Sequence, residues 1–193
     1  MNMPIRFELD VASPRQVEAV LAEARSLKQA SARHGSGRGL QRPEIATTAA
    51  LRALADLMTM QERSRKPLAG TRLCFVGDPR TPRGDAVLQA AALTGIDLRI
   101  AAPVSIWPHE NRLALAQARA VETGGQISLH ESTAQAAEGV DFVMDETAWL
   151  SHRPVIVPGA DWPTMDVGLD ENEVDNLPFV LEAASRMEIL GRY

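Results

Sequence analysis

Apolar residues in the middle of the chain gather into short runs, and longer stretches with helical periodicity separate these runs. The short runs predict buried parallel strands, because a strand covered on both faces reads as a nearly continuous apolar segment. The predicted strands are Arg72 to Val76, Asp97 to Ala101, Gln126 to His130, Asp141 to Met144 and Val155 to Val157. The strict alternation of strand and helix predicts a three-layer αβα Rossmann-like domain with about five parallel strands and right-handed crossovers.

Helical segments fill the spaces between these strands. An apolar pattern that begins at Ala86 predicts a helix ending at Gly95, since glycine suits a left-handed C-cap. Two further helices are predicted over residues 109–122 and 132–137.

The N-terminal part of the chain predicts one helix and a linker. Ser13 followed by Pro14 is a helix start signal, and apolar residues at helical spacing continue to Ala32. The basic, glycine-rich stretch 33–39 is interpreted as a flexible linker. We therefore expect residues 1–42 to form an N-terminal helix and a flexible linker.

The rest of the chain is expected to form one α/β domain, residues 43–193. It opens with a helix predicted from about Pro43 to Arg63. It closes with a helix from Asp170 to Leu190 that is predicted to be broken or kinked at Pro178, because proline removes a helical hydrogen bond.

Composition narrows the classes of partner. The formal net charge of −5 argues against nucleic acid and anionic membrane surfaces, both of which attract basic proteins. No apolar stretch approaches the roughly 18 residues that a membrane span needs, and no secretory signal pattern opens the sequence. The one cysteine, Cys74, lies inside an apolar run and is interpreted as a small buried hydrophobe rather than a nucleophile. A cytoplasmic location is expected.

The turn after the first predicted strand is the first candidate for a ligand site. In open α/β sheets ligands bind outside the carboxyl ends of the strands, and this turn carries Asp78, Arg80 and Arg83. It lacks the G-x-G-x-x-G pattern of dinucleotide-binding proteins, and the histidines and acids show no tight metal-ligand spacing. The sequence therefore predicts neither a cofactor nor a metal.

Several short segments, in order and at matching spacing, resemble the second, amino-acid-binding domain of the aspartate/ornithine carbamoyltransferase family. The resemblance covers about Thr48 to Arg186 and implies the fold already predicted. The segments that carry it are Ala53 to Glu62 (A-L-A-D-L-M-T-M-Q-E), Pro67 to Gly70, Phe75 to Asp78, Gly95 to Pro103, Ala120 to Gly125, Ala136 to Val143 and Ala183 to Met187.

The same resemblance reveals what this chain does not carry. The family's first domain binds carbamoyl phosphate with an S-T-R-T-R loop, and residues 33–42 take the place of nearly all of that domain. The family's H-P-x-Q segment corresponds to residues 49–52, Ala-Ala-Leu-Arg, and its late H-C-L-P segment to residues 155–158, Val-Ile-Val-Pro. Groups for binding and polarising the carbamoyl donor are absent, so the chain is not expected to carry out carbamoyl transfer alone.

The resemblance also implies substrate-binding positions. Arg83 matches an arginine that pairs with a substrate carboxylate in the aspartate branch, and Arg80 adds charge to the same loop. Glu146 and Ser151 are the nearest matches to an acid and a serine that hold the amino acid in the ornithine branch, although the spacing to Trp149 is one residue longer. His152 is a candidate general base. For the arginines and the histidine, an exposed charge with no ligand is the alternative interpretation.

Three hypotheses about function follow. The first is a carbamoyltransferase-like protein that binds a small amino acid or dicarboxylate without catalysis of its own. The second is a carboxyl- or carbamoyltransferase-type enzyme whose active site is completed by another chain, or one with new chemistry around Arg83, Glu146 and His152. The third is a structural interaction module. The expected protein partners are a second copy, joined through the terminal helices, or a complete transcarbamylase.

Overall fold

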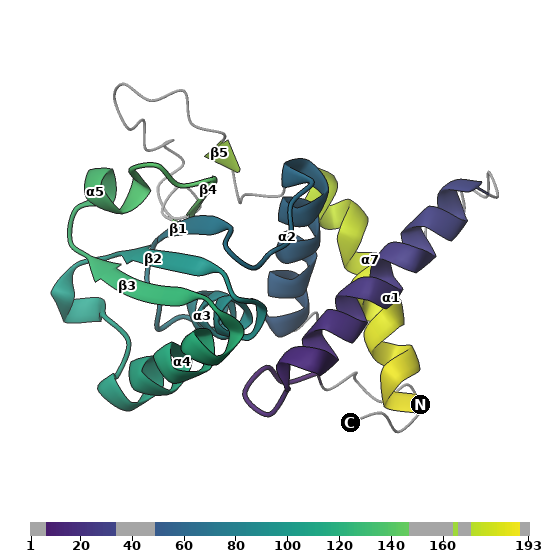
Figure 1. Cartoon of the computed structure of the whole chain (residues 1–193), viewed down its shortest axis with the longest axis horizontal. Coiled ribbons are helices and arrows are strands. Elements are labelled where there is room, and N and C mark those ends of the chain that lie inside the picture. The colour runs from purple at the N-terminus through teal and green to yellow at the C-terminus, as the bar shows by residue number, and fades with distance from the viewer. Residues whose placement is uncertain (1–6, 34–48, 147–163, 166–170, 190–193) are drawn as a thin grey trace.

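A computed structural model describes residues 7–33, 49–146, 164–165 and 171–189, and its centre is a parallel sheet (Figure 1). The sheet has five strands in the order β3-β2-β1-β4-β5. The strands are β1 (Arg72–Val76), β2 (Asp97–Ala101), β3 (Gln126–His130), β4 (Phe142–Asp145) and β5 (Thr164–Met165). The parallel α/β prediction is confirmed, and the first three strands have the predicted bounds. The predicted strand Val155 to Val157 lies outside the described residues, and the fifth strand comes later in the chain.

Helices cover both faces of the sheet. Alternate residues of β1 show this division: Leu73 and Phe75 belong to the larger core with α3 (Pro82–Thr94) and α4 (Glu110–Thr123). Cys74 and Val76 face the other way and pack with α5 (Thr133–Ala137) in a smaller core. The three-layer arrangement is therefore confirmed (Figure 1).

The start of α3 differs from the prediction. The helix begins at Pro82 rather than at Ala86, with Thr81 as its N-cap, and it ends at Gly95, whose φ of 73° is the predicted left-handed C-cap. Proline at the first helical position after a threonine cap is a local signal for this earlier start. As a consequence, Arg83 lies in the first turn of the helix and not in the loop.

Three more helices form a layer beside the sheet. They are α1 (Pro14–Arg33), α2 (Ala49–Ser64) and α7 (Glu171–Ile189), and Figure 1 shows α1 and α7 crossing side by side next to α2. Every residue of α2 from Ala53 to Met60 is buried. The N- and C-terminal helices α1 and α7 pack against each other within one chain. The predicted start of α2 near Pro43 lies outside the described residues.

α7 continues through Pro178 as one helix, so of the predicted break or kink the break does not occur. An internal proline costs about 3 kcal/mol of helix stability. The residues that follow it, among them Val180, Leu181 and Ala183, are buried in the core shared with α1 and α2. This packing offsets the lost helical hydrogen bond.

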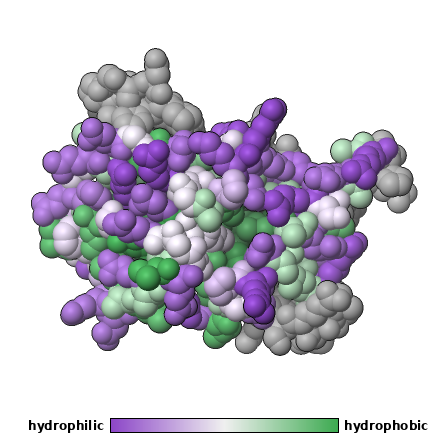
Figure 2. Space-filling model, viewed as in Figure 1, coloured by the Kyte–Doolittle hydropathy of each residue, from purple (hydrophilic) through white to green (hydrophobic). Residues whose placement is uncertain are grey.

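The surface of the described residues is mostly polar, with small apolar areas between polar side chains, as Figure 2 shows for one face. Its large, exposed apolar side chains are Val11, Val104, Leu115 and Val121. None of the helices in the described ranges has the length and hydropathy needed to cross a bilayer.

Candidate functional site

The candidate site lies at the carboxyl edge of the sheet, between β1 and β4. From β1 the chain builds outward through β2 to β3, and it then returns to place β4 on the other side of β1. This reversal is the topological switch point at which ligands bind in open α/β sheets. The Glu146 amide donates to the Val76 carbonyl oxygen at 2.9 Å, which brings the ends of the two strands together.

Gly77 allows the two strand ends to come this close. A Cβ at Gly77 would lie 3.0 Å from the Cβ of Glu146 and 3.4 Å from the ring of Phe75. A larger residue would push the Glu146 side chain away from β1. The glycine after the first strand is therefore a requirement of the close approach between this turn and Glu146.

The turn and the first helical residues of α3 form one hydrogen-bonded unit. The Arg80 amide donates to Asp78 Oδ1 at 2.8 Å, and the Thr81 hydroxyl donates to the Asp78 carbonyl oxygen at 3.0 Å. The Gly84 amide donates to Thr81 Oγ1 at 3.0 Å, which completes the N-cap. A Cβ at Gly84 would lie 2.5 Å from the Asp78 carbonyl oxygen, so the helix sits directly on the turn.

Arg83 lies between two carboxylates. Its Nη2 is 2.5 Å from Oδ2 of Asp56 on α2, and its Nε is 3.6 Å from Oε1 of Glu146. The Asp56 side chain is 1% exposed and the Arg83 side chain 17% exposed. The structure thus brings two predicted site residues, Arg83 and Glu146, together, and it places a third group, Asp56, in the pair.

Three carboxylates belong to this cluster: Asp56 and Glu146 pair with Arg83, and the charge of Asp78 acts on Glu146. Burial raises the pKa of Glu146 and the charge of Asp78 raises it further, while the charge of Arg83 and the nearby Thr81 hydroxyl oppose the shift. A raised carboxyl pKa marks a site where a further positive charge is favourable. A ligand ammonium group fits this environment.

Arg80 has a different setting from Arg83. Its side chain is exposed, and its Nε donates to the Trp107 carbonyl oxygen at 2.7 Å. The Trp107 indole in turn donates to the Ala102 carbonyl oxygen at 2.9 Å. Arg80 therefore links the turn after β1 to the segment after β2, and its side chain is exposed.

Three predicted site residues, Trp149, Ser151 and His152, lie outside the described residues. Cys74 is buried, and its burial raises the pKa of its thiol to about 12, so the thiol stays protonated at neutral pH. The interpretation of Cys74 as a small core residue is confirmed. In the described part of the chain, no three His, Cys, Asp or Glu side chains are grouped as a metal site.

Sequence reasoning missed Asp56 and Thr81 as members of the site. A signal for Asp56 was present, because it is the single carboxylate in the otherwise apolar helical stretch Leu54 to Met58. A carboxylate on a buried helix face predicts a buried cation partner. Thr81 was identifiable as a helix cap from the proline that follows it.

Comparison with known proteins agrees with this description. Residues 69–154 match the family model "Aspartate/ornithine carbamoyltransferase, Asp/Orn binding domain". An ornithine carbamoyltransferase of Neisseria animalis is 44% identical over 98 residues, which are 51% of this chain and 42% of that protein. The match thus spans about two fifths of the length of this curated relative.

Solved structures are similar in fold. The ornithine carbamoyltransferase of Pyrococcus furiosus aligns with a TM-score of 0.69 and 15% identity, covering 100% of this chain and 99% of that chain. The ornithine carbamoyltransferase of Gloeobacter violaceus aligns with a TM-score of 0.66 and 16% identity, covering 94% and 98%. At this level of identity the likeness establishes the fold alone.

Proposed function

We propose that this chain binds a small amino acid at the switch point between β1 and β4, because residues 69–154 match the model of the Asp/Orn binding domain of the aspartate/ornithine carbamoyltransferase family. The observation that supports this most directly is the cluster at this strand edge, where Arg83 pairs with Asp56 and Glu146 and where burial and the charge of Asp78 raise the pKa of Glu146. In this proposal Glu146 pairs with the ammonium group of the ligand. Arg80, exposed on the same turn, is the partner for the ligand carboxylate.

This assignment changes the role first expected for Arg83. A carboxylate ligand at Arg83 competes with Asp56, whose oxygen already lies 2.5 Å from the guanidinium in a buried position. If Arg83 turned to a ligand carboxylate, the buried carboxylate of Asp56 would lose its cation, and leaving a buried charge unpaired is costly. Arg83 is therefore proposed to hold Glu146 in place rather than to bind the ligand carboxylate.

We also propose that the chain does not carry out carbamoyl transfer alone. This rests on the sequence, which lacks the family's S-T-R-T-R loop and its histidine in the segment before A-L-A-D-L. Transfer needs donors aimed at the carbamoyl oxygen and a site for the phosphate. The match covers about two fifths of the curated relative. The alternative proposal is therefore an enzyme whose active site is completed by another chain. A cytoplasmic location and a homo-oligomer remain predictions.

The first test measures binding with and without Glu146. Isothermal titration of the purified chain with L-ornithine, L-aspartate and succinate is expected to show binding of an amino acid and none of succinate, which has no ammonium group. Glu146→Gln removes the charge and is expected to weaken amino-acid binding by about tenfold or more. Glu122→Gln, an exposed acid on α4, is the matched control and leaves binding unchanged.

Two results contradict the proposal. If succinate binds, and binds equally well to Glu146→Gln, the ligand is held by its carboxylate at the arginines and not by an ammonium group at Glu146. Formation of citrulline or carbamoyl-aspartate by the pure chain, supplied with carbamoyl phosphate, would overturn the claim that it cannot act alone.

Binding is also expected to depend on pH through Glu146. The ligand ammonium pairs with the ionised carboxylate, so affinity is full above the raised pKa of Glu146 and falls as the pH drops through it. The fall approaches about tenfold per pH unit below that pKa. Titrations from about pH 8 down to about pH 4 cover the range of a raised carboxyl. In Glu146→Gln this part of the pH dependence is expected to disappear, and an unchanged profile would assign it to another group.

A further inference from the structure

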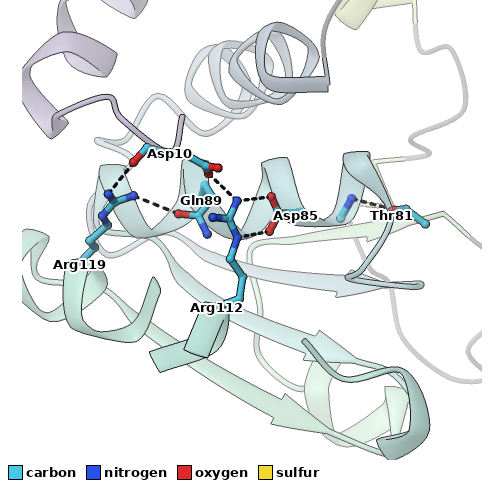
Figure 3. A network of polar contacts seen from close by, with 7 residues as sticks. Asp10, Thr81, Asp85, Gln89, Arg112 and Arg119 are labelled. Carbon is cyan, nitrogen blue, oxygen red and sulfur yellow. Dashed lines mark hydrogen bonds and ion pairs between the residues drawn. The ribbon is translucent and has the colours of Figure 1, made fainter. Parts of the chain in front are cut away.

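An arginine on α4 holds the first turn of α3 from outside the candidate site. Arg112 donates from Nε to Asp85 Oδ1 at 2.7 Å and from Nη2 to Asp85 Oδ2 at 2.5 Å, so the pair is bidentate (Figure 3). Parallel double hydrogen bonds of this kind fix orientation as well as distance. Arg112 itself belongs to a helix that follows β2, and it contacts the site only through Asp85.

Asp85 is tied to the residues that form the site. Its amide donates to the Thr81 carbonyl oxygen at 2.9 Å, and the neighbouring Gly84 amide donates to Thr81 Oγ1 at 3.0 Å. Arg83 lies two residues before Asp85 in the same helical turn. A displacement of Asp85 therefore moves the turn that carries Thr81 and Arg83, and Arg83 Nε lies 3.6 Å from Glu146 Oε1.

A second carboxylate, from the N-terminal segment, shares Arg112. Asp10 Oδ1 accepts a hydrogen bond from Arg112 Nη2, and the Asp10 carbonyl oxygen accepts one from Arg119 Nη2 at 2.7 Å. Phe7 and Leu9 anchor this segment in the core, where they are 1% and 4% exposed. The contacts of Arg112 thus join the N-terminal segment, α4 and the first turn of α3 (Figure 3).

We propose that Arg112 is a positioning residue for the ligand site: by its bidentate pair with Asp85 it fixes the first turn of α3, and through that turn it sets Arg83 and Thr81 against Glu146. The part of the proposal that concerns ligand binding rests on the proposed function. The part that concerns the first turn of α3 stands on the contacts alone. Its test therefore has one readout that needs no ligand.

Arg119 supplies a matched control on the same helix. Like Arg112 it binds the N-terminal segment and α3: its Nη2 donates to the Asp10 carbonyl oxygen and its Nη1 to Gln89 Oε1 at 3.2 Å. Its hydrogen bond to α3 goes to Gln89 and not to Asp85. Arg119→Gln also removes a charge and a contact with α3, but that contact is at Gln89, about one helical turn after Asp85. Arg112→Gln removes the Asp85 pair, and Arg112→Lys keeps the charge while losing the two parallel donors.

The experiment measures amide hydrogen exchange across the purified full chain. In Arg112→Gln, exchange at Gly84 and Asp85 is expected to rise by about tenfold, with a smaller rise in Arg112→Lys and none in Arg119→Gln. The amides of β1 should keep their protection in all three variants. L-Ornithine titrations of the same variants should show weaker binding for Arg112→Gln and unchanged binding for Arg119→Gln.

The outcomes separate this inference from the proposed function. Equal exchange at Gly84 and Asp85 in Arg112→Gln and the wild type would overturn the positioning role, as would an equal rise in Arg119→Gln. The expected exchange pattern in a chain that binds neither L-ornithine nor L-aspartate would support positioning of the turn and contradict the proposed ligand.

Discussion

Replacing Arg83 by alanine is expected to lower the free energy of unfolding by about 3 kcal/mol. The change leaves the carboxylate of Asp56, which is 1% exposed, without the guanidinium that lies 2.5 Å from it. A buried carboxylate that loses its cation either stays charged at a high cost or takes up a proton, and both weaken the fold. Equilibrium urea denaturation at neutral pH measures the loss.

Arg80→Ala is the matched control for this prediction. Arg80 belongs to the same turn, but its side chain is exposed and its hydrogen bond goes to a backbone carbonyl oxygen at 2.7 Å. Its replacement is expected to change stability by no more than about 0.5 kcal/mol. The double variant Asp56→Ala, Arg83→Ala should lose less than the sum of the single losses, because each single change leaves a partner behind. Equal, small losses in Arg83→Ala and Arg80→Ala would show that the buried pair contributes little.

The structural role of Arg83 decides how the ligand site is tested. Arg83→Ala is the obvious variant for a proposed carboxylate site, but a loss of binding in a destabilised chain does not identify a contact with the ligand. The Glu146 side chain is 21% exposed, and its 3.6 Å contact with Arg83 is longer than the 2.5 Å contact between Arg83 and Asp56. Glu146→Gln therefore removes a charge from the candidate site without breaking the closer Asp56 pair. It is the cleaner probe of the ligand.

The strands were predictable from the sequence because their signal is local. β1 is a short apolar run, whereas β2 and β3 alternate apolar and polar residues between turn residues, and both patterns are local signals of a strand. The start of α3 was equally local, since Thr81 and Pro82 form a cap signal that outweighs the later apolar pattern. The prediction failed there because it followed apolar spacing instead of the cap.

The setting of Arg83 was not predictable in the same way. Its partner Asp56 lies on another helix, and no local pattern tells which cation a buried carboxylate will meet. Resemblance to a family identified Arg83 and Glu146 as site residues, but it assigned the arginine to a ligand. Because α2 packs against α3, Asp56 pairs with the Arg83 guanidinium.

The structure also explains the A-L-A-D-L-M-T-M-Q-E segment of α2. Asp56 binds Arg83 beside the candidate site, whereas Thr59 and Glu62 bind Asn176 of α7. One helix therefore connects the candidate site to the C-terminal helix. In the same arrangement α1 and α7 bury their apolar residues against each other and against α2, so the apolar faces of the terminal helices are covered within one chain.

Asn176→Ala is expected to lower the free energy of unfolding by about 2 kcal/mol and the melting temperature by roughly 6 °C. Asn176 is completely buried; its Nδ2 donates to Thr59 Oγ1 at 2.9 Å and to Glu62 Oε2 at 3.1 Å, and its Oδ1 accepts from Lys28 Nζ at 2.6 Å. Alanine removes all three bonds at once and leaves a buried hydroxyl and a cation with fewer partners. Calorimetry and urea denaturation measure the loss.

Arg186→Ala on the same helix is the control, because it also breaks polar links between α7 and the rest of the chain. Arg186 pairs with Glu23 at 3.0 Å and with Glu182 at 2.9 Å, but its side chain is 49% exposed. Water replaces such bonds, so the loss is expected to stay within about 0.5 kcal/mol. A large effect of Arg186→Ala together with a small one of Asn176→Ala would mean that surface ion pairs hold α7. The expected result, a large loss in Asn176→Ala and a small one in Arg186→Ala, would mean that the buried hydrogen bonds between α2 and Asn176 hold α7. The helix that carries Asp56 would then also be the helix on which the position of α7 depends.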